Sequence, residues 1–276
     1  MILRRIKQLF GASTADVLTM PAVGGTGIAP RPLTIYLPPF RDPDEEHALL
    51  IALDGQTMPG WRLGETLAEL SLKEQIMPTI IVAVPASTHR LDEYGLAGEV
   101  DYRGRGAKAA AFQAYLLGTV LPRVRQRLVV TSNPARTGIF GASMGGLCAF
   151  DSAWNRPDVF GVAGVFSGAL WWRSDNSTPD AQQTSRILHR RVRAARRGPA
   201  LRLWFQAGTK DETDDRDGNG VIDAIQDTTE LMDALATRGY RRGTDMHYEE
   251  VRGGEHNEAT WARALPEFLR WALRRR

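Results

Sequence analysis

The sequence has a single cysteine, Cys148, and no long apolar run. One cysteine excludes an internal disulfide, and its position among small and apolar residues predicts a buried helix residue rather than a reactive thiol. A membrane-spanning helix needs about 18 consecutive apolar residues, so we expect no membrane-embedded segment and no membrane partner. Arg4, Arg5 and Lys7 interrupt the start of the chain, which therefore lacks the apolar stretch of a signal peptide. These features together predict a cytoplasmic protein.

The sequence also has little net charge and no motif for nucleic-acid binding. Its 35 Lys and Arg residues exceed its 32 Asp and Glu residues by three, and the basic residues gather at 185–198 and 274–276. Neither segment interleaves basic with aromatic residues, so a solvated helix face and a charged tail are expected, with no nucleic-acid partner. With 43% hydrophobic and 24% charged residues, the composition is that of a globular protein.

Apolar runs alternate with helix-like segments along most of the chain. Several of these runs are apolar nearly throughout, as in parallel strands that are buried on both faces. The pattern predicts an α/β fold with a mostly parallel sheet and helices on both faces, in one domain at 31–276 after a lead-in at 1–30. Strands are expected at 33–39, 48–54, 79–85, 137–142, 160–168, 201–208 and 245–251; helices are expected at 64–74, 106–127, 144–155, 182–197, 222–238 and 259–273.

A serine lies among glycines where a predicted strand meets a predicted helix. The residues "GASMG", Gly141–Gly145, match G-x-S-x-G, the sharp turn that exposes a nucleophilic serine above a sheet edge. The N–H of Met144, at the start of the helix, faces the same point and can bind a developing oxyanion. We expect a second donor at Gln56, directly after the strand at 48–54. The motif predicts Ser143 as a nucleophile.

A neutral serine needs a base, and the order Ser, acid, His is typical of this motif. His256 fits because it follows the last predicted strand. Asp211 follows the strand before it and is the first choice for the acid, which would orient the imidazole and stabilise its protonated form. Glu212 is the alternative, and Asp214 comes third.

These residues and the segments around them resemble the esterase family of α/β-hydrolases that includes enterochelin esterase-like proteins, feruloyl esterases, S-formylglutathione hydrolase and the mycolyltransferases. The similar segments include "ALDGQ", "HRLDEYG", "GASMGG", "FSGALWW", "AGTKDE" and "HNEATWARALPEFLRW", in family order from about residue 33 to 271. The resemblance implies an α/β-hydrolase fold, an ester or thioester substrate, and Ser143, Asp211 and His256 as the catalytic triad.

Three further residues are candidates for substrate binding. Trp171 and Trp172 follow the strand at 160–168, on the edge that carries the serine, and either could wall a pocket or pack beneath a loop. Arg90 could shape the rim, although an ion pair between Arg90 and Glu93 is favoured slightly.

The segment 215–227 resembles a calcium-binding loop. It follows the pattern D-x-[DN]-x-[DN]-G, but Gln226 stands where a bidentate Glu is expected. A structural calcium ion and an Asx-rich turn are both compatible with this sequence. The candidate ligands are Asp215, Asp217, Asn219, the Val221 carbonyl and Asp223.

The sequence therefore predicts a serine hydrolase that cleaves small-molecule carboxylic esters through an acyl-enzyme, with no cofactor needed for the chemistry. An acyltransferase of the same mechanism, or a non-enzymatic binding protein on the same scaffold, is the alternative. The sequence leaves the oligomeric state open.

Overall fold

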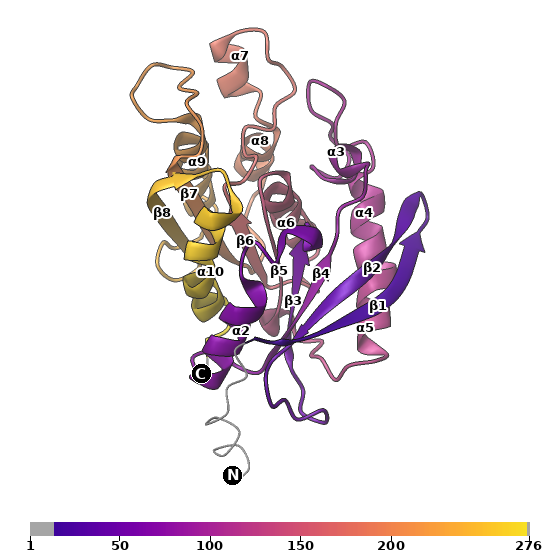
Figure 1. Ribbon diagram of the computed structural model, residues 1–276. Coiled ribbons are helices and arrows are strands. Elements are labelled where there is room, and N and C mark those ends of the chain that lie inside the picture. The colour runs from indigo at the N-terminus through magenta and orange to yellow at the C-terminus, as the bar shows by residue number, and fades with distance from the viewer. Residues whose placement is uncertain (1–13, 275–276) are drawn as a thin grey trace.

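The computed structural model describes residues 14–274 and arranges eight strands in a single sheet (Figure 1). The strand order is β1-β2-β4-β3-β5-β6-β7-β8. The six strands from β4 to β8 in this order pair in parallel. Strand β2 pairs antiparallel with both of its neighbours, β1 and β4. The strands are β1 (Asp16–Gly25), β2 (Ile28–Leu37), β3 (Ala48–Leu53), β4 (Thr79–Val84), β5 (Thr137–Ala142), β6 (Val162–Phe166), β7 (Arg202–Lys210) and β8 (Met246–Glu255).

Seven of these strands lie where the sequence predicts them, and β1 does not. It falls in the segment taken as a lead-in, where most side chains are exposed and Pro21 interrupts the apolar residues. An edge strand needs no continuous apolar run, because one edge and much of its surface face water. The register of β1 against β2 also shifts between Met20 and Val23, which blurs any alternating pattern.

Helices cover both faces of the sheet. The side chains of β3 alternate between these faces, as strand geometry requires: Leu49 and Ile51 belong to one apolar core, and Leu50 to the other. The first core includes residues of α4, α6, α8 and α9; the second includes residues of α2 and α10. The helices are α2 (Leu63–Leu72), α3 (Arg90–Glu93), α4 (Ala109–Tyr115), α5 (Leu121–Arg125), α6 (Met144–Asn155), α7 (Pro179–Thr184), α8 (Ile187–Ala194), α9 (Asp223–Ala236) and α10 (Glu258–Ala272), with short turns η1 (Gly55–Thr57), η2 (Leu116–Val120) and η3 (Pro134–Arg136).

Two predicted helices are divided in the structure. The segment 106–127 forms α4, the π-helical turn η2 and α5 in succession, and the segment 182–197 is shared between α7 and α8. Among residues 14–274, no helix is long and apolar enough to cross a membrane.

Candidate active site

Ser143 is the single residue between β5 and α6, and its backbone is strained. Its φ of 56° and ψ of −125° are rare for a residue with a side chain, and such conformations cluster at functional sites. Its N–H donates to the Phe166 carbonyl at 2.9 Å, and its carbonyl accepts from Ala169 N at 3.0 Å. A Cβ atom on Gly141 would lie 2.8 Å from the Gly145 carbonyl carbon, so the turn excludes a side chain there. The flanking residues thus hold Ser143, which is partly buried, in its strained turn.

His256 and Asp211 meet at the same edge of the sheet, each just after a strand. His256 Nδ1 lies 3.8 Å from Asp211 Oδ1, which is within the range of an ion pair and longer than a hydrogen bond. Hydrogen bonds of catalytic groups are often long without substrate and shorten when it binds. Asp211 is buried, whereas His256 is partly open to solvent. The pair has the arrangement that is expected of an orienting acid and a base.

Ser167 and Trp261 fix the carboxylate, and the sequence analysis assigned neither of them a role. Ser167 Oγ donates to Asp211 Oδ1 at 3.0 Å and accepts a hydrogen bond from Trp261 Nε1 at 2.9 Å. The other oxygen, Asp211 Oδ2, accepts from Gly208 N at 2.8 Å. The Trp261 ring also contacts the His256 ring edge-on, with 5.4 Å between centroids. Ser167 lies in the segment "FSGALWW" and has a φ of 42°, a signal that only the backbone reveals.

The surroundings of the pair shift both pKa values. Burial raises the pKa of Asp211, although hydrogen bonds from Gly208 and Ser167 favour its charged form. Burial lowers the pKa of His256, and the Arg90 charge lowers it further against the opposing effect of Asp211. Lowering the His256 pKa keeps the imidazole neutral at neutral pH, in the form that accepts a proton.

The two predicted oxyanion donors come from neighbouring parallel strands. Met144 is the first residue of α6, so its N–H has no acceptor within the helix. Gln56 lies in η1, directly after β3, and β3 pairs in parallel with β5. Both backbone segments therefore reach the carboxyl edge of the sheet beside Ser143. The Gln56 side chain points elsewhere and accepts a hydrogen bond from Ala86 N at 2.9 Å.

The favoured pairing of Arg90 with Glu93 is wrong. Arg90 donates from Nε and Nη2 to the two carboxylate oxygens of Asp54, both at 2.7 Å. Glu93 instead binds Arg31 through two hydrogen bonds of 2.8 Å. The sequence could not reveal these partners, because they come from β2 and from the end of β3, far from α3 along the chain.

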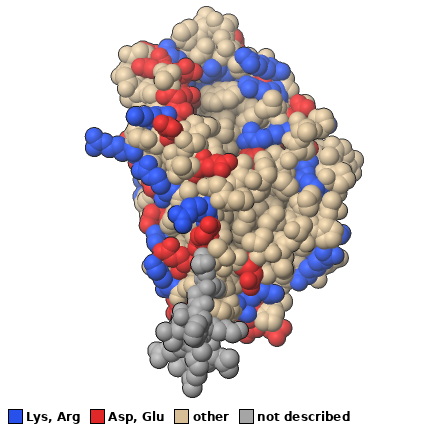
Figure 2. Space-filling model, viewed as in Figure 1, with Lys and Arg blue, Asp and Glu red and all other residues tan. Residues whose placement is uncertain are grey.

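The two tryptophans differ in role. Trp172 is fully buried, packs against Gly95 and Gly106, and donates from Nε1 to the Glu99 carbonyl at 3.3 Å. Trp171 lines a pocket, with the Arg105 guanidinium 4.9 Å from its ring centroid. The full lining is Tyr102, Arg103, Arg105, Trp171, Arg173, Glu212, Asp214 and Asp223. Figure 2 shows basic side chains around a hollow in the upper part of the molecule, where Figure 1 places α3 and α8.

Glu212 and Asp214, the other candidate acids, line this pocket. Burial raises the pKa of Glu212 to about 7, and the neighbouring charges of Asp214, Asp223 and Asp227 add to that effect. Of the three candidates, Asp211 is the one whose carboxylate lies beside His256, with 3.8 Å between Oδ1 and Nδ1. The geometry therefore favours Asp211 as the acid.

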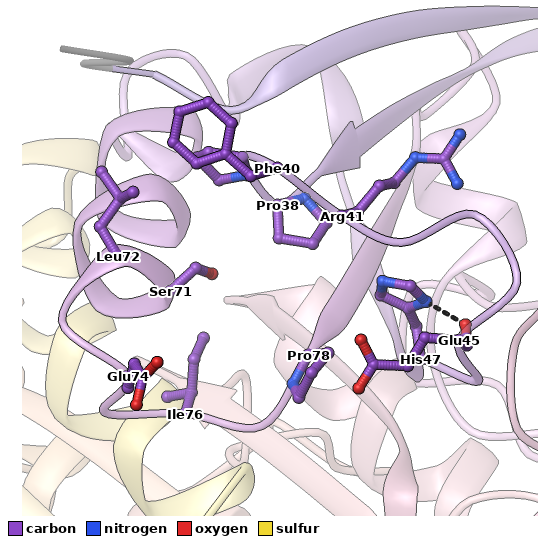
Figure 3. Close-up of a pocket in the computed structure, with 11 residues that line it drawn as sticks. Pro38, Phe40, Arg41, Glu45, His47, Ser71, Leu72, Glu74, Ile76 and Pro78 are labelled. Atoms are coloured by element: carbon purple, nitrogen blue, oxygen red, sulfur yellow. Dashed lines mark hydrogen bonds between the residues drawn. The ribbon is translucent and has the colours of Figure 1, made fainter. Parts of the chain in front are cut away.

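Three of the four other histidines lie elsewhere. His189 is buried in α8, where Nε2 lies 2.8 Å from the Asp227 carbonyl oxygen, and His247 of β8 stacks on Trp204 of β7. His47 precedes β3 and lines a pocket at the opposite, amino-terminal edge of the sheet, where its Nδ1 lies 2.6 Å from the Glu45 carbonyl oxygen (Figure 3). That pocket is thus separated from Ser143 by the length of β3.

The segment 215–227 is an exposed loop followed by the first turn of α9. Asp215 accepts hydrogen bonds from the N–H groups of Asn219 and Gly220, at 3.1 and 2.9 Å. Gln226 donates to Asp217 at 2.8 Å, and Asp223 forms an ion pair with Arg216 at 3.1 Å. Within residues 14–274, no three His, Cys, Asp or Glu side chains gather as a metal site. A calcium ion would therefore compete with Arg216 for Asp223.

Comparisons with known proteins agree with this fold and motif. A family model described as "Putative esterase" matches residues 29–272. The uncharacterized protein YbbA from Bacillus subtilis is 26% identical over 153 residues, which are 54% of this chain and 60% of that protein. The iron(III) enterobactin esterase from Dickeya dadantii is 26% identical over 168 residues, which are 59% of this chain and 35% of that protein. The matches thus span only part of each curated relative.

Solved structures confirm the α/β-hydrolase fold. The ferric enterobactin esterase from Salmonella typhimurium superposes with a TM-score of 0.73 at 22% identity, over 95% of this chain and 59% of that chain. A ferulic acid esterase superposes with a TM-score of 0.70 at 16% identity, over 95% of this chain and 99% of that one. Since the family model covers most of the sequence, the chain belongs to the "Putative esterase" family of α/β-hydrolases.

Proposed function

We propose that the protein hydrolyses carboxylic esters through a serine acyl-enzyme. The observation that carries this proposal is the strained Ser143 turn, at the same sheet edge where His256 lies beside the buried Asp211. A strained backbone conformation costs of the order of 1–3 kcal/mol, so its presence beside a base and an acid favours a catalytic role. The family match supports an ester as the substrate.

In the proposed reaction, Ser143 Oγ attacks the ester carbonyl carbon while His256 takes the hydroxyl proton. The N–H groups of Met144 and Gln56 bind the resulting oxyanion. His256 then gives its proton to the leaving alcohol, and the acyl group remains on Ser143. Water activated by His256 attacks the acyl-enzyme and releases the acid. Asp211 keeps the Nδ1 proton of His256 in place and stabilises the imidazolium form.

The pocket lined by Trp171 and Glu212 supports a more specific substrate, an ester with a hydroxylated aromatic acyl group. Trp171 supplies an aromatic face, and the Arg105 and Arg173 guanidinium groups lie 4.9 and 5.9 Å from its ring centroid. Guanidinium groups donate several hydrogen bonds to oxygen atoms and also stack on rings. The structural relatives include an enterobactin esterase crystallised with 2,3-dihydroxy-N-benzoyl-serine and a ferulic acid esterase.

Ser143→Ala tests the reaction. We expect this variant to keep the wild-type melting temperature and to lose both hydrolysis of p-nitrophenyl acetate and labelling by a fluorophosphonate probe. Labelling of the alanine variant at the wild-type rate would disprove the nucleophile assignment. A matched comparison of methyl ferulate with an aliphatic ester of similar size tests the acyl group, and transfer to an added alcohol would reveal an acyltransferase.

A further inference from the structure

The ion pair between Arg90 and Asp54 lies directly beside the proposed oxyanion hole. Asp54 directly follows β3 and immediately precedes η1, which contains Gln56. A Cβ atom on Gly145 would lie 3.0 Å from Asp54 Oδ2, so the carboxylate packs against the first turn of α6. The Asp54 side chain is about 10% exposed. One carboxylate therefore touches both segments that carry the expected oxyanion donors.

The backbone of Asp54 is also held from several sides. It has a φ of 55° and a ψ of 46°, in the left-handed region that residues with side chains rarely adopt. Its N–H donates to the Tyr94 hydroxyl at 3.0 Å, and its carbonyl accepts from Thr57 N at 2.8 Å. The Asp54 carboxylate accepts a weak bond from the Gln56 side chain at 3.4 Å. These contacts set the direction of the backbone that enters η1.

A carboxylate at this place would hinder the reaction if it were unpaired, because its charge opposes the negative charge that develops on the oxyanion. Arg90 removes that obstacle with a bidentate pair, the strongest geometry available to a carboxylate. Its guanidinium also lies 5.1 Å from the centroid of the Tyr94 ring, so Tyr94 supports both partners. Asp54 can therefore hold the backbone that enters η1 while its negative charge, paired with Arg90, no longer opposes the oxyanion.

Arg90 acts on the base as well. The charged groups that act on the His256 ring are Asp211, at the end of β7, and Arg90, on α3. The Arg90 charge lowers the pKa of His256, and Asp211 raises it. The guanidinium that binds Asp54 beside the oxyanion segment therefore also carries a charge that lowers the pKa of the base.

We propose that Arg90 and Asp54 are positioning residues for ester hydrolysis: Asp54 orients the Gln56 N–H, and Arg90 neutralises Asp54 beside the oxyanion. This inference rests on the proposed function. It differs from the expectation that Arg90 binds substrate, because the side of the guanidinium formed by Nε and Nη2 is already occupied by Asp54. A positioning role predicts a loss in kcat, whereas a substrate-binding role predicts a rise in KM.

The test compares Arg90→Gln, Arg90→Lys and the double variant Arg90→Gln/Asp54→Asn on p-nitrophenyl acetate. We expect Arg90→Gln to lower kcat by about 100-fold with little change in KM, similar to the loss of one oxyanion donor. The double variant should regain at least about tenfold of that loss, because it no longer holds an unpaired carboxylate. Arg90→Lys keeps the charge without the bidentate geometry and should fall between wild type and Arg90→Gln.

The pH profile supplies a readout that a merely structural role would not move. Without the Arg90 charge, the pKa of His256 rises, so the acidic limb of kcat/KM should shift to higher pH in Arg90→Gln and stay in place in Arg90→Lys. A raised KM at unchanged kcat in Arg90→Gln would overturn the proposal. So would an unshifted pH profile in Arg90→Gln together with a double variant that loses more kcat than Arg90→Gln and regains none. Should Arg90→Gln fail to fold, Arg90→Lys and the double variant are each compared with the wild type. A raised KM at unchanged kcat in either variant, or an unshifted acidic limb in the double variant, would then overturn the proposal.

Two controls keep this result separate from the proposed function. Arg156→Gln removes an exposed bidentate pair with Asp158, at the end of α6, and should leave kcat and KM unchanged. Ser143→Ala reports whether the measured hydrolysis depends on the nucleophile at all. If Ser143→Ala is inactive while Arg90→Gln behaves as wild type, the reaction stands and the positioning role fails.

Discussion

Asp211→Asn replaces the proposed orienting acid with a neutral side chain of nearly the same shape. Asp211 Oδ2 accepts from Gly208 N, while Oδ1 faces Ser167 Oγ and His256 Nδ1. Asparagine has a single acceptor oxygen, and the Gly208 N–H can only donate. The oxygen should therefore stay on Gly208, which turns the amide NH₂ towards Ser167 and His256. Ser167 can adapt because its hydroxyl can accept, but His256 must then present an unprotonated Nδ1.

That requirement fixes the wrong tautomer of His256. The ring proton moves to Nε2, the nitrogen proposed to take the proton of Ser143, so the imidazole cannot act as the base. In a triad, this fault lowers kcat by about 10⁴. The loss corresponds to about 5 kcal/mol of transition-state stabilisation. KM should change little, because the Asp211 side chain is buried.

The assay is kcat for p-nitrophenyl acetate at pH 7.5, corrected for the uncatalysed rate, with a melting curve for each variant. Glu212→Gln is the matched control. It makes the same change from carboxylate to amide one residue away, in a side chain that lines the Trp171 pocket and is not part of the proposed triad. It should retain most of the activity. If Asp211→Asn stays within about tenfold of wild type while Glu212→Gln is inactive, the acid is Glu212 and the reasoning from the Asp211–His256 contact is refuted.

Two further predictions concern stability. Burial lowers the pKa of His189 to about 3, so the folded protein keeps this ring neutral while the unfolded chain protonates it below about pH 6.5. The free energy of unfolding should therefore fall by at most about 4 kcal/mol as the pH falls from about 6.5 towards 3. The fall should be less steep in His189→Gln, which keeps a donor for the Asp227 carbonyl. Equal pH dependence of the unfolding free energy in the two proteins, measured by urea titration, would contradict this. We also propose that the segment 215–227 binds calcium weakly. Millimolar calcium should raise the melting temperature, EDTA should reverse the rise, and Asp217→Ala should abolish it while keeping hydrolysis; an unmoved curve would leave an Asx-rich turn as the better interpretation.

Some features of this protein follow from the sequence alone, because they depend on neighbouring residues. The turn at Ser143 brings Gly141 and Gly145, two positions before and after it, into close contact, and "GASMG" supplies glycine at both. The helix predicted at 144–155 matches α6 (Met144–Asn155), and the apolar strands fall close to their predicted positions, because burial on both faces leaves an uninterrupted apolar run. Local composition was sufficient for the fold class and for the nucleophile candidate.

Other features depend on which distant segments meet, and only the tertiary structure decided them. Asp211 and Glu212 are adjacent acids after the same strand, yet their side chains leave the backbone in different directions and only the packing selects the one near His256. Arg90 could pair with any nearby acid, and its partner is Asp54, which follows β3, and not an acid of α3. Such long-range contacts leave no periodic pattern in the sequence. They join residues whose separation along the chain depends on the whole fold, whereas sequence periodicity reports only the geometry of a single helix or strand.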